Sequence, residues 1–450
     1  MAKLLVRLGM AVIGFLVIVP ASQAMTIQKV EGPAGVEAWL VEDYTVPMIT
    51  MDFVFAGGSA QDPAGKPGVA NMLSGLLDEG AGDMTSTAFQ KALDDHSISM
   101  SFDAGRDGFF GDLKTLSEDR TEAFDLLAAA LQKPRFDREP LDRVRAQITS
   151  NIKSDANDPQ AAATLAVCAK AFPNHPYGWS LDGTAESVAA IGRDDLEAYR
   201  GRVFARDNLK VAIVGAISPK DVSAMLERVF GPLPEKARLT PVADIVPQAG
   251  IIALDQPNPQ TLIRFGGPGI KRSDPDFLAA YVVNHILGGG SFSSRLYSEV
   301  REKRGLAYSI STTLVTLTHA SAFAGGTATR ADRAAETIAI IKQETARLAV
   351  EGPTEAELAK AKSYLIGSYA LRFDSSTKIA SQVLGIMIDN LGIDYVEKRN
   401  SLIADVSIED ARRAARRLFT DGTSMVATVG PAKTKTATAD TAGAVPAPQL

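Results

Sequence analysis

The chain has only one cysteine, Cys168, among 450 residues. A single thiol cannot close a disulfide within the chain, so the fold does not rely on cross-links, and we expect Cys168 to be a small core residue rather than a nucleophile. Aromatic residues are also scarce, at 6%, although hydrophobic residues make up 46% of the chain. This composition supplies packed cores for roughly two to four domains and excludes disordered and collagen-like proteins.

An excess of basic residues is missing as well. Lys and Arg number 47 against 53 Asp and Glu, which leaves a net charge of −6 without long runs of one sign. Because binding to nucleic-acid phosphates needs a concentrated basic surface, the charge pattern argues against a nucleic-acid partner.

Long hydrophobic runs are absent except for residues 8–19, and these 12 residues are too few to span a membrane. The run follows Lys3 and Arg7 and precedes Ser22-Gln23-Ala24, the small-x-small pattern of a cleavage site. We therefore expect residues 1–24 to be a secretory signal peptide. The mature chain would carry a net charge of −8, contain no integral membrane segment, and be exported to the periplasm.

Local metal and phosphate motifs are missing too. The four histidines, at positions 96, 175, 285 and 319, are far apart in sequence, and none forms a pair at the spacing of a metal-binding helix. The run Gly-Gly-Gly-Ser at 288–291 is not followed by the Lys-Ser or Lys-Thr of a phosphate-binding loop. We expect the histidines to be ordinary surface or core residues.

The chain does contain an internal repeat. Residues 191–215 and 406–430 correspond at an offset of 215, and both predict a helix followed by a short apolar strand. The strand ends FAGGS (55–59) and FGGPG (265–269) also correspond. A period this long indicates a duplicated domain rather than a solenoid.

The expected fold class is therefore α+β, with two homologous halves that each form a mostly antiparallel sheet with helices packed on one face. In the first half the pattern predicts strands at 37–42 and 49–55 and helices near 68–78, 118–132 and 138–155. The expected divisions of the chain are a first half (25–230), a proline-rich linker (231–249), a second half (250–432) and a disordered tail (433–450).

Three stretches carry a family resemblance: FAGGSAQDPAGKPGVANMLSGLLDEG (55–80), residues 175–215 and GGGSFSSRLYSEVREKRGLAYSI (288–310). Together they resemble the pitrilysin/insulinase family of inverted zinc metallopeptidases, in the smaller form made of two homologous halves. The resemblance covers nearly the whole mature chain.

The chain departs from this family at its zinc site. Active members carry H-x-x-E-H on the helix after the Gly-Gly strand and a further Glu on a later helix. The matching positions here are Asn71, Ser74 and Gly75, and Asn151 for the later Glu. Because an amide, a hydroxyl and a hydrogen atom cannot replace imidazoles and carboxylates as zinc ligands, we expect no metal site in this chain.

The second half keeps another family feature, an Arg and a Tyr seven residues apart, at Arg301 and Tyr308. Residues 293–303 predict a helix, Gly305 a left-handed stop, and 307–314 a strand, which would bring the two side chains close together. In the family such a pair holds peptide carbonyls and stabilises the tetrahedral oxyanion. The spacing alone favours a plainer interpretation, in which Arg301 belongs to a solvated charge cluster at 301–304 and Tyr308 packs on the sheet.

The resemblance implies a non-catalytic subunit of a heterodimeric exported metallopeptidase. A homologous partner would carry H-x-x-E-H and the zinc, this chain would carry no cofactor, and the two would close as a clamshell on unstructured peptides. Gly288, Gly289 and Gly290 would form either a substrate loop open to backbone approach or a mobile turn at a helix start. The alternative function is a catalytically inactive structural or peptide-binding homologue with no peptidase role.

The signal-peptide prediction can be tested directly. N-terminal sequencing of the protein from its native host should begin at or near Met25, because Ala24 ends the expected cleavage site. Recovery of a stable cytoplasmic form that begins at Met1 would contradict the prediction.

Overall fold

The computed structural model describes residues 25–431. The predicted signal peptide (1–24) and the predicted tail (433–450) lie outside the described residues. Within the described part, no helix combines the length and the apolar character that crossing a bilayer requires.

The first half is built on a six-stranded sheet in the order β1-β2-β8-β3-β7-β6. Its strands are β1 (Gln28–Glu31), β2 (Glu37–Glu42), β3 (Met48–Ala56), β6 (Ser99–Ala104), β7 (Gly108–Leu116) and β8 (Leu209–Gly215). All neighbours pair antiparallel except β2 and β8. The strands predicted at 37–42 and 49–55 are thus confirmed as β2 and β3.

The second half is built on a five-stranded sheet in the order β11-β12-β10-β13-β9. Its strands are β9 (Gly250–Asp255), β10 (Thr261–Pro268), β11 (Ala307–Thr316), β12 (Ser321–Thr329) and β13 (Met425–Gly430). The only parallel pair, β13 with β9, corresponds to β8 with β2. The second sheet therefore repeats the topology of the first without β1.

Helices follow the same repeat. The first half contains α1 (Val69–Ser74), α2 (Ser86–Asp95), α3 (Arg120–Gln132), α4 (Arg138–Asp155), α5 (Pro159–Ala171), α6 (Ala185–Ala190), α7 (Arg193–Val203) and α8 (Pro219–Phe230), with a small hairpin of β4 (Gly80–Ala81) and β5 (Met84–Thr85). The second contains α9 (Phe277–Asn284), α10 (Ala334–Glu351), α11 (Glu355–Gly367), α12 (Ser376–Ile388), α13 (Tyr395–Ala404) and α14 (Ile408–Phe419). Helix α14 begins 215 positions after α7, at residue 408 against 193. The expected α+β fold of two homologous halves is confirmed.

One expected helix is shorter than its pattern suggested. The apolar spacing predicted a helix over 68–78, but α1 ends at Ser74. Gly75 caps it, and the next residues form turns, because glycine is a poor helix former. The helices expected at 118–132 and 138–155 are confirmed as α3 and α4.

Each sheet is apolar on both faces. In the first sheet, Phe53 and Ile213 point into a core shared with α1, α3, α7 and α8, whereas Val54 and Val214 point to the opposite, inner face. Alternation along a strand places successive side chains on opposite faces, so a sheet buried on both sides needs two covering layers.

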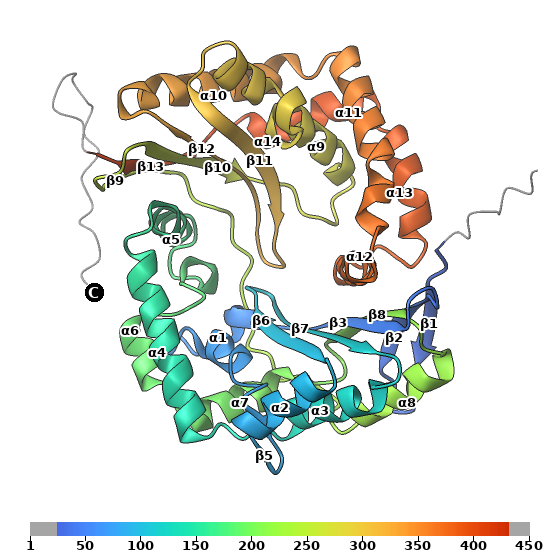
Figure 1. The fold of residues 1–450 in the computed structure, drawn as a ribbon. Helices are drawn as coiled ribbons and strands as arrows, with labels where there is room; N and C mark the ends of the chain where they lie inside the picture. The colour runs from blue at the N-terminus through green and yellow to red at the C-terminus, as the bar shows by residue number, and fades with distance from the viewer. Residues whose placement is uncertain (1–24, 432–450) are drawn as a thin grey trace, which may run out of the picture.

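The inner faces are covered by an exchange between the halves. Helix α12 of the second half lies on β3 and β8 and packs Val383 and Met387 against Val214. Helix α5 of the first half lies on β9, β10 and β13 and packs Ala163 against Val429. Figure 1 shows both helices between the two sheets. Because α5 and α12 are equivalent helices of the repeat, the exchange is reciprocal.

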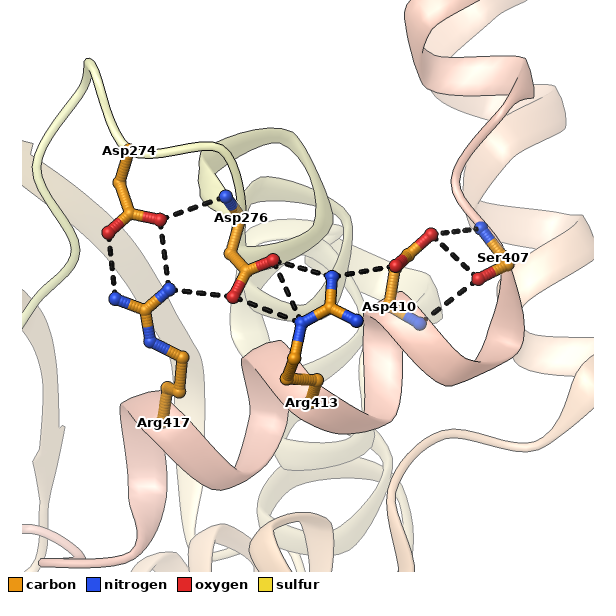
Figure 2. Close-up of polar contacts among 6 residues, drawn as sticks. All are labelled: Asp274, Asp276, Ser407, Asp410, Arg413 and Arg417. Carbon is orange, nitrogen blue, oxygen red and sulfur yellow. Dashed lines mark hydrogen bonds and ion pairs between the residues drawn. The ribbon is translucent and has the colours of Figure 1, made fainter.

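A polar network fixes α14 against the beginning of α9 (Figure 2). The buried Asp276 carboxylate accepts hydrogen bonds from Arg413 (2.6 Å to Nη2) and Arg417 (2.6 Å to Nη1). Arg417 also pairs with Asp274, and Asp410 links Arg413 to the Ser407 cap of α14. Hydrogen bonds from Arg413 hold the pKa of the Asp276 carboxyl below its ordinary value.

Replacing Asp276 should therefore weaken the second half. We expect Asp276→Ala to lower the free energy of unfolding by about 2 kcal/mol, because it leaves two arginines, each about half exposed, without their shared acceptor. The matched control is Asp332→Ala, which removes an exposed ion pair with Arg330. It should change the free energy of unfolding by less than about 0.5 kcal/mol. Urea unfolding measures both, and equal effects would contradict the prediction.

The same network predicts an acid dependence. Because the folded-state pKa of Asp276 lies below its unfolded value, its contribution is present above about pH 4 and is lost as the pH falls below that value. The stability difference between the parent chain and Asp276→Ala should therefore shrink in acid.

Candidate functional site

The degenerate zinc-site positions lie on α1, at its C-cap Gly75 and on α4 of the first half. Helix α1 begins after Gly68, whose φ of +100° places it in the left-handed region. The carboxylate of Asp62 accepts hydrogen bonds from the backbone amides of Gly68 (2.7 Å) and Ala70 (2.8 Å) and so caps the helix. Burial raises the pKa of Asp62 to about 7 in spite of these donors.

The residues that replace the family's ligands are engaged in ordinary packing. The amide nitrogen of Asn71 donates to Asp182 at 2.8 Å, and the hydroxyl of Ser74 donates to the carbonyl of Asn71 at 2.8 Å. Gly75 faces α4 so closely that a Cβ there would lie 3.2 Å from Cγ1 of Val144. These contacts hold the short helix in place with groups that offer no imidazole or carboxylate to a metal.

Asn151 lies on α4, two turns beyond Val144. Its side-chain oxygen accepts a hydrogen bond from Gln147 at 2.8 Å, and its side chain is exposed. No group of three or more His, Cys, Asp or Glu side chains in residues 25–431 is arranged to hold a metal ion. Since the donor set at these four positions does not fit zinc, we derive no chemistry from a metal in this chain.

Arg301 lies in the second half, on an unusual helical turn. The helix expected at 293–303 is wound mainly as a π-helix, Tyr297–Glu302. Gly305 follows this helix by three residues and has the predicted left-handed conformation (φ 60°), and the amide of Leu306 donates to the carbonyl of Val300 at 2.9 Å. The chain then enters β11, so the predicted helix, left-handed stop and strand follow in the expected order.

The structure brings Arg301 and Tyr308 together. The guanidinium carbon of Arg301 lies 4.7 Å from the ring centroid of Tyr308 and 4.9 Å from that of Tyr297. A third ring, of Phe292, lies 6.0 Å away, and a guanidinium nitrogen donates to the Tyr297 hydroxyl. Contacts between a cation and aromatic faces at these distances are attractive, so three rings orient the arginine.

Tyr308 is aimed outward by the strand that carries it. The pairing of β11 with β12 shifts between Ala307 and Ile310, and Tyr308 lies in this β-bulge. Bulges re-aim side chains next to functional sites. The Tyr308 side chain is 82% exposed, and its hydroxyl makes no hydrogen bond to any residue in the described part of the chain.

The charged neighbours of Arg301 turn away from it. Lys303 and Arg304 both pair with Glu299, at 2.6 Å and 2.5 Å. Hydrogen bonds from these two cations lower the pKa of Glu299. The run at 301–304 is therefore divided, with two cations in a surface ion-pair cluster and Arg301 among aromatic rings.

Gly288 and Gly289 do not form the open loop or helix-start turn considered from the sequence. They lie inside a π-helical segment, His285–Gly289, that continues α9, and Gly290 ends it. A Cβ at Gly288 would lie 2.6 Å from the hydroxyl oxygen of Thr312 on β11, which explains the need for glycine. The expectation of a loop is therefore wrong for these two residues, because close packing on β11 extends the helix.

Sequence reasoning missed three residues that support the site. Tyr297 and Phe292 contact Arg301, and Arg295 anchors the same segment through a bidentate pair with Glu357 of α11 (2.7 and 2.8 Å). Burial raises the pKa of Glu357, but the hydrogen bonds from Arg295 outweigh it and bring the value to about 2. Tyr297 precedes Arg301 by four residues, a helical contact spacing that could have revealed it, whereas Glu357 is 62 positions from Arg295.

Two family models match the chain. The model described as Insulinase (Peptidase family M16) matches residues 39–185, and the model described as Peptidase M16 inactive domain matches residues 190–365. Together they include the degenerate zinc-site positions and the site around Arg301.

Relatives of known sequence extend over most of the chain. A Helicobacter pylori protein described as non-peptidase homolog YmxG is 28% identical over 394 residues, which cover 86% of this chain and 90% of that protein. The uncharacterized zinc protease ML0855 of Mycobacterium leprae is 27% identical over 370 residues, which cover 80% of this chain and 82% of that protein.

A solved structure has the same arrangement. The crystal structure of a peptidase M16 inactive domain from Pseudomonas fluorescens superposes with a TM-score of 0.86 at 29% identity, and covers 92% of this chain and 99% of that one. The two-half fold of this chain is thus shared with a solved structure.

The purified chain should bind no stoichiometric zinc and cleave no peptide, because these four positions supply no metal ligand. The triple variant Asn71→His, Ser74→Glu, Gly75→His should bind zinc at least about tenfold more weakly than the quadruple variant that adds Asn151→Glu, since the last ligand is then present. Metal analysis and zinc titration measure both. One zinc per parent chain, or tight binding by the triple variant, would contradict the assignment.

Proposed function

Because the chain belongs to the insulinase (peptidase M16) family, we propose that it is the non-catalytic subunit of a heterodimeric, exported zinc metallopeptidase. A homologous partner carries H-x-x-E-H and the zinc, and this chain supplies Arg301 and Tyr308. The two subunits together cleave unstructured peptides inside the chamber that they enclose.

One observation carries the proposal. Arg301 contacts three aromatic rings, and two of them, of Phe292 (72% exposed) and Tyr308 (82% exposed), face solvent. Large exposed aromatic side chains around an ordered cation do not stabilise a monomer through burial. They form a surface suited to a ligand or a partner.

The chemistry of the two side chains suits a peptide in the course of hydrolysis. Arg301 is a fixed cation with several donors and can hold a peptide carbonyl oxygen. The Tyr308 hydroxyl has no partner in the described chain and is free to donate to the oxyanion of the tetrahedral intermediate. Ordered donors of this kind need no reorganisation when negative charge develops.

Extended peptides also suit the sheets. β6 and β11 are the edge strands at the equivalent ends of the two sheets, and β11 carries Tyr308. An edge strand offers backbone amides and carbonyls that an extended chain can pair with. A folded protein could not add a strand in this way, which favours short or unstructured substrates.

We expect Tyr308→Phe and Arg301→Ala to co-purify with the H-x-x-E-H partner at normal stoichiometry while kcat/KM for an unstructured peptide falls at least about tenfold. Tyr308→Phe removes only a hydroxyl that makes no intrachain hydrogen bond in the described residues, so packing is preserved. Rates of the reconstituted pair and the stoichiometry of the complex are the measurements.

Two matched variants serve as controls. Tyr44→Phe removes the hydroxyl of another exposed tyrosine, and Arg304→Ala removes a neighbouring cation that pairs with Glu299. Both should leave kcat/KM unchanged. Unchanged kinetics in the Arg301 and Tyr308 variants would show that these residues are ordinary surface side chains without a catalytic role. Loss of assembly would instead make them interface residues and favour a structural homologue with no peptidase role.

A further inference from the structure

A cavity of about 370 Å³ lies between α5 and the inner face of the second sheet. Helix α5 contributes Val167 and Cys168, and the sheet contributes residues of β10, β11 and β12. Its volume is within the range of small-molecule sites in proteins. Arg301 and Tyr308 do not line it, so it is separate from the site described above.

The cavity exists because small residues occupy several neighbouring positions of the sheet at its floor. On β10, Gly266 is paired with Ala324 of β12, and Pro268 with Ala322. Gly326 is the next small residue in the same row, opposite Arg264. Neighbouring positions with one carbon or none leave a hollow that larger side chains would fill. Most of the remaining lining is apolar.

Among residues 25–431, the charged side chains that line the cavity are Arg106 and Arg264, and neither forms an ion pair with a carboxylate. Arg264 donates to Gln160 at 2.9 Å, while its buried Nε has no hydrogen-bond acceptor. Arg106 makes only two long contacts, 3.4 Å to the carbonyl of Trp179 and 3.4 Å to the sulfur of Cys168. In residues 25–431 no carboxylate lies within ion-pair distance of either guanidinium. Partly buried cations without acceptors are costly, and an anion would offset that cost.

We propose that this cavity binds a small molecule with an apolar body and one anionic group, such as a medium-chain carboxylate. The apolar body occupies the hollow over Gly266, Ala324 and Gly326. The anionic group lies with Arg106 and Arg264 and supplies the acceptor that the Nε of Arg264 lacks. This site does not depend on a peptidase partner.

The test uses the full chain, titrated calorimetrically with decanoate, decanol and decylamine. Decanoate should bind at one site per chain, and decanol at least about tenfold more weakly, because it lacks the charge that the arginines require. Decylamine should not bind, since its ammonium group meets two like charges. Equal binding of decanoate and decanol would overturn the proposal.

Variants locate the ligand. Arg264→Gln and Arg106→Gln should each weaken decanoate binding about tenfold or more, and Ala324→Leu should abolish it by filling the hollow. The matched controls are Arg416→Gln and Ala356→Leu, at exposed positions outside the cavity. Unchanged affinity in both arginine variants would overturn the proposal. Circular dichroism establishes that each variant is folded.

Cys168 gives a second, independent measurement. It is the chain's only thiol, and it lines the cavity in contact with Arg106. Decanoate should slow its reaction with a maleimide, and decylamine should not. A peptide that ends in leucine with a free carboxylate is titrated in the same way, to test whether a chain end occupies the cavity. If that peptide binds more tightly than decanoate, the occupant is a chain end and the small-molecule assignment is wrong.

Discussion

The reciprocal exchange of α5 and α12 is the constraint on which the rest of the structure depends. Each sheet has apolar side chains on both faces, and its own helices cover only one. The inner face is buried by a helix of the other half, so neither half satisfies its own sheet. Burying this much apolar surface fixes the halves relative to each other, with their inner faces turned together (Figure 1).

The two halves share a topology but have diverged in chemistry. In the first, the helix after the Gly-Gly strand is short, is capped by Asp62 and is tied to Asp182 through Asn71. These bonds stabilise a scaffold that provides no metal ligands. In the second, a π-helical turn extends the corresponding helix α9, and a later π-helical segment, Tyr297–Glu302, presents Arg301 beside Tyr308. The two halves thus share a backbone arrangement but carry different side-chain chemistry.

Polar and aromatic groups without a charged partner lie at the two sites that we propose for binding other molecules. In the Asp276 network each arginine has a carboxylate partner (Figure 2). Arg301 is paired with rings instead of an acid, and Arg106 and Arg264 face an apolar cavity without counterions. Partly buried cations without a carboxylate partner destabilise the isolated chain, and a bound partner or ligand would offset this effect.

The sequence by itself determined the strands β2 and β3 and the left-handed stop at Gly305, because these depend on residue type and short spacing. It also revealed the repeat, through similarity at a constant offset of 215 residues. It also predicted that Arg301 lies near Tyr308, since only the turn at Gly305 separates the helix that carries Arg301 from the strand that carries Tyr308. Only the tertiary structure decided the π-winding at Tyr297–Glu302, the packing of Gly288 on Thr312, and the pair of Arg295 with Glu357. The meeting of Arg106 with Arg264 in one cavity was likewise decided there. The contacts of Gly288 with Thr312 and of Arg295 with Glu357 join segments of the second half that are distant in sequence. Arg106 and Arg264 line one cavity only because the two halves dock, so no local pattern encodes these contacts.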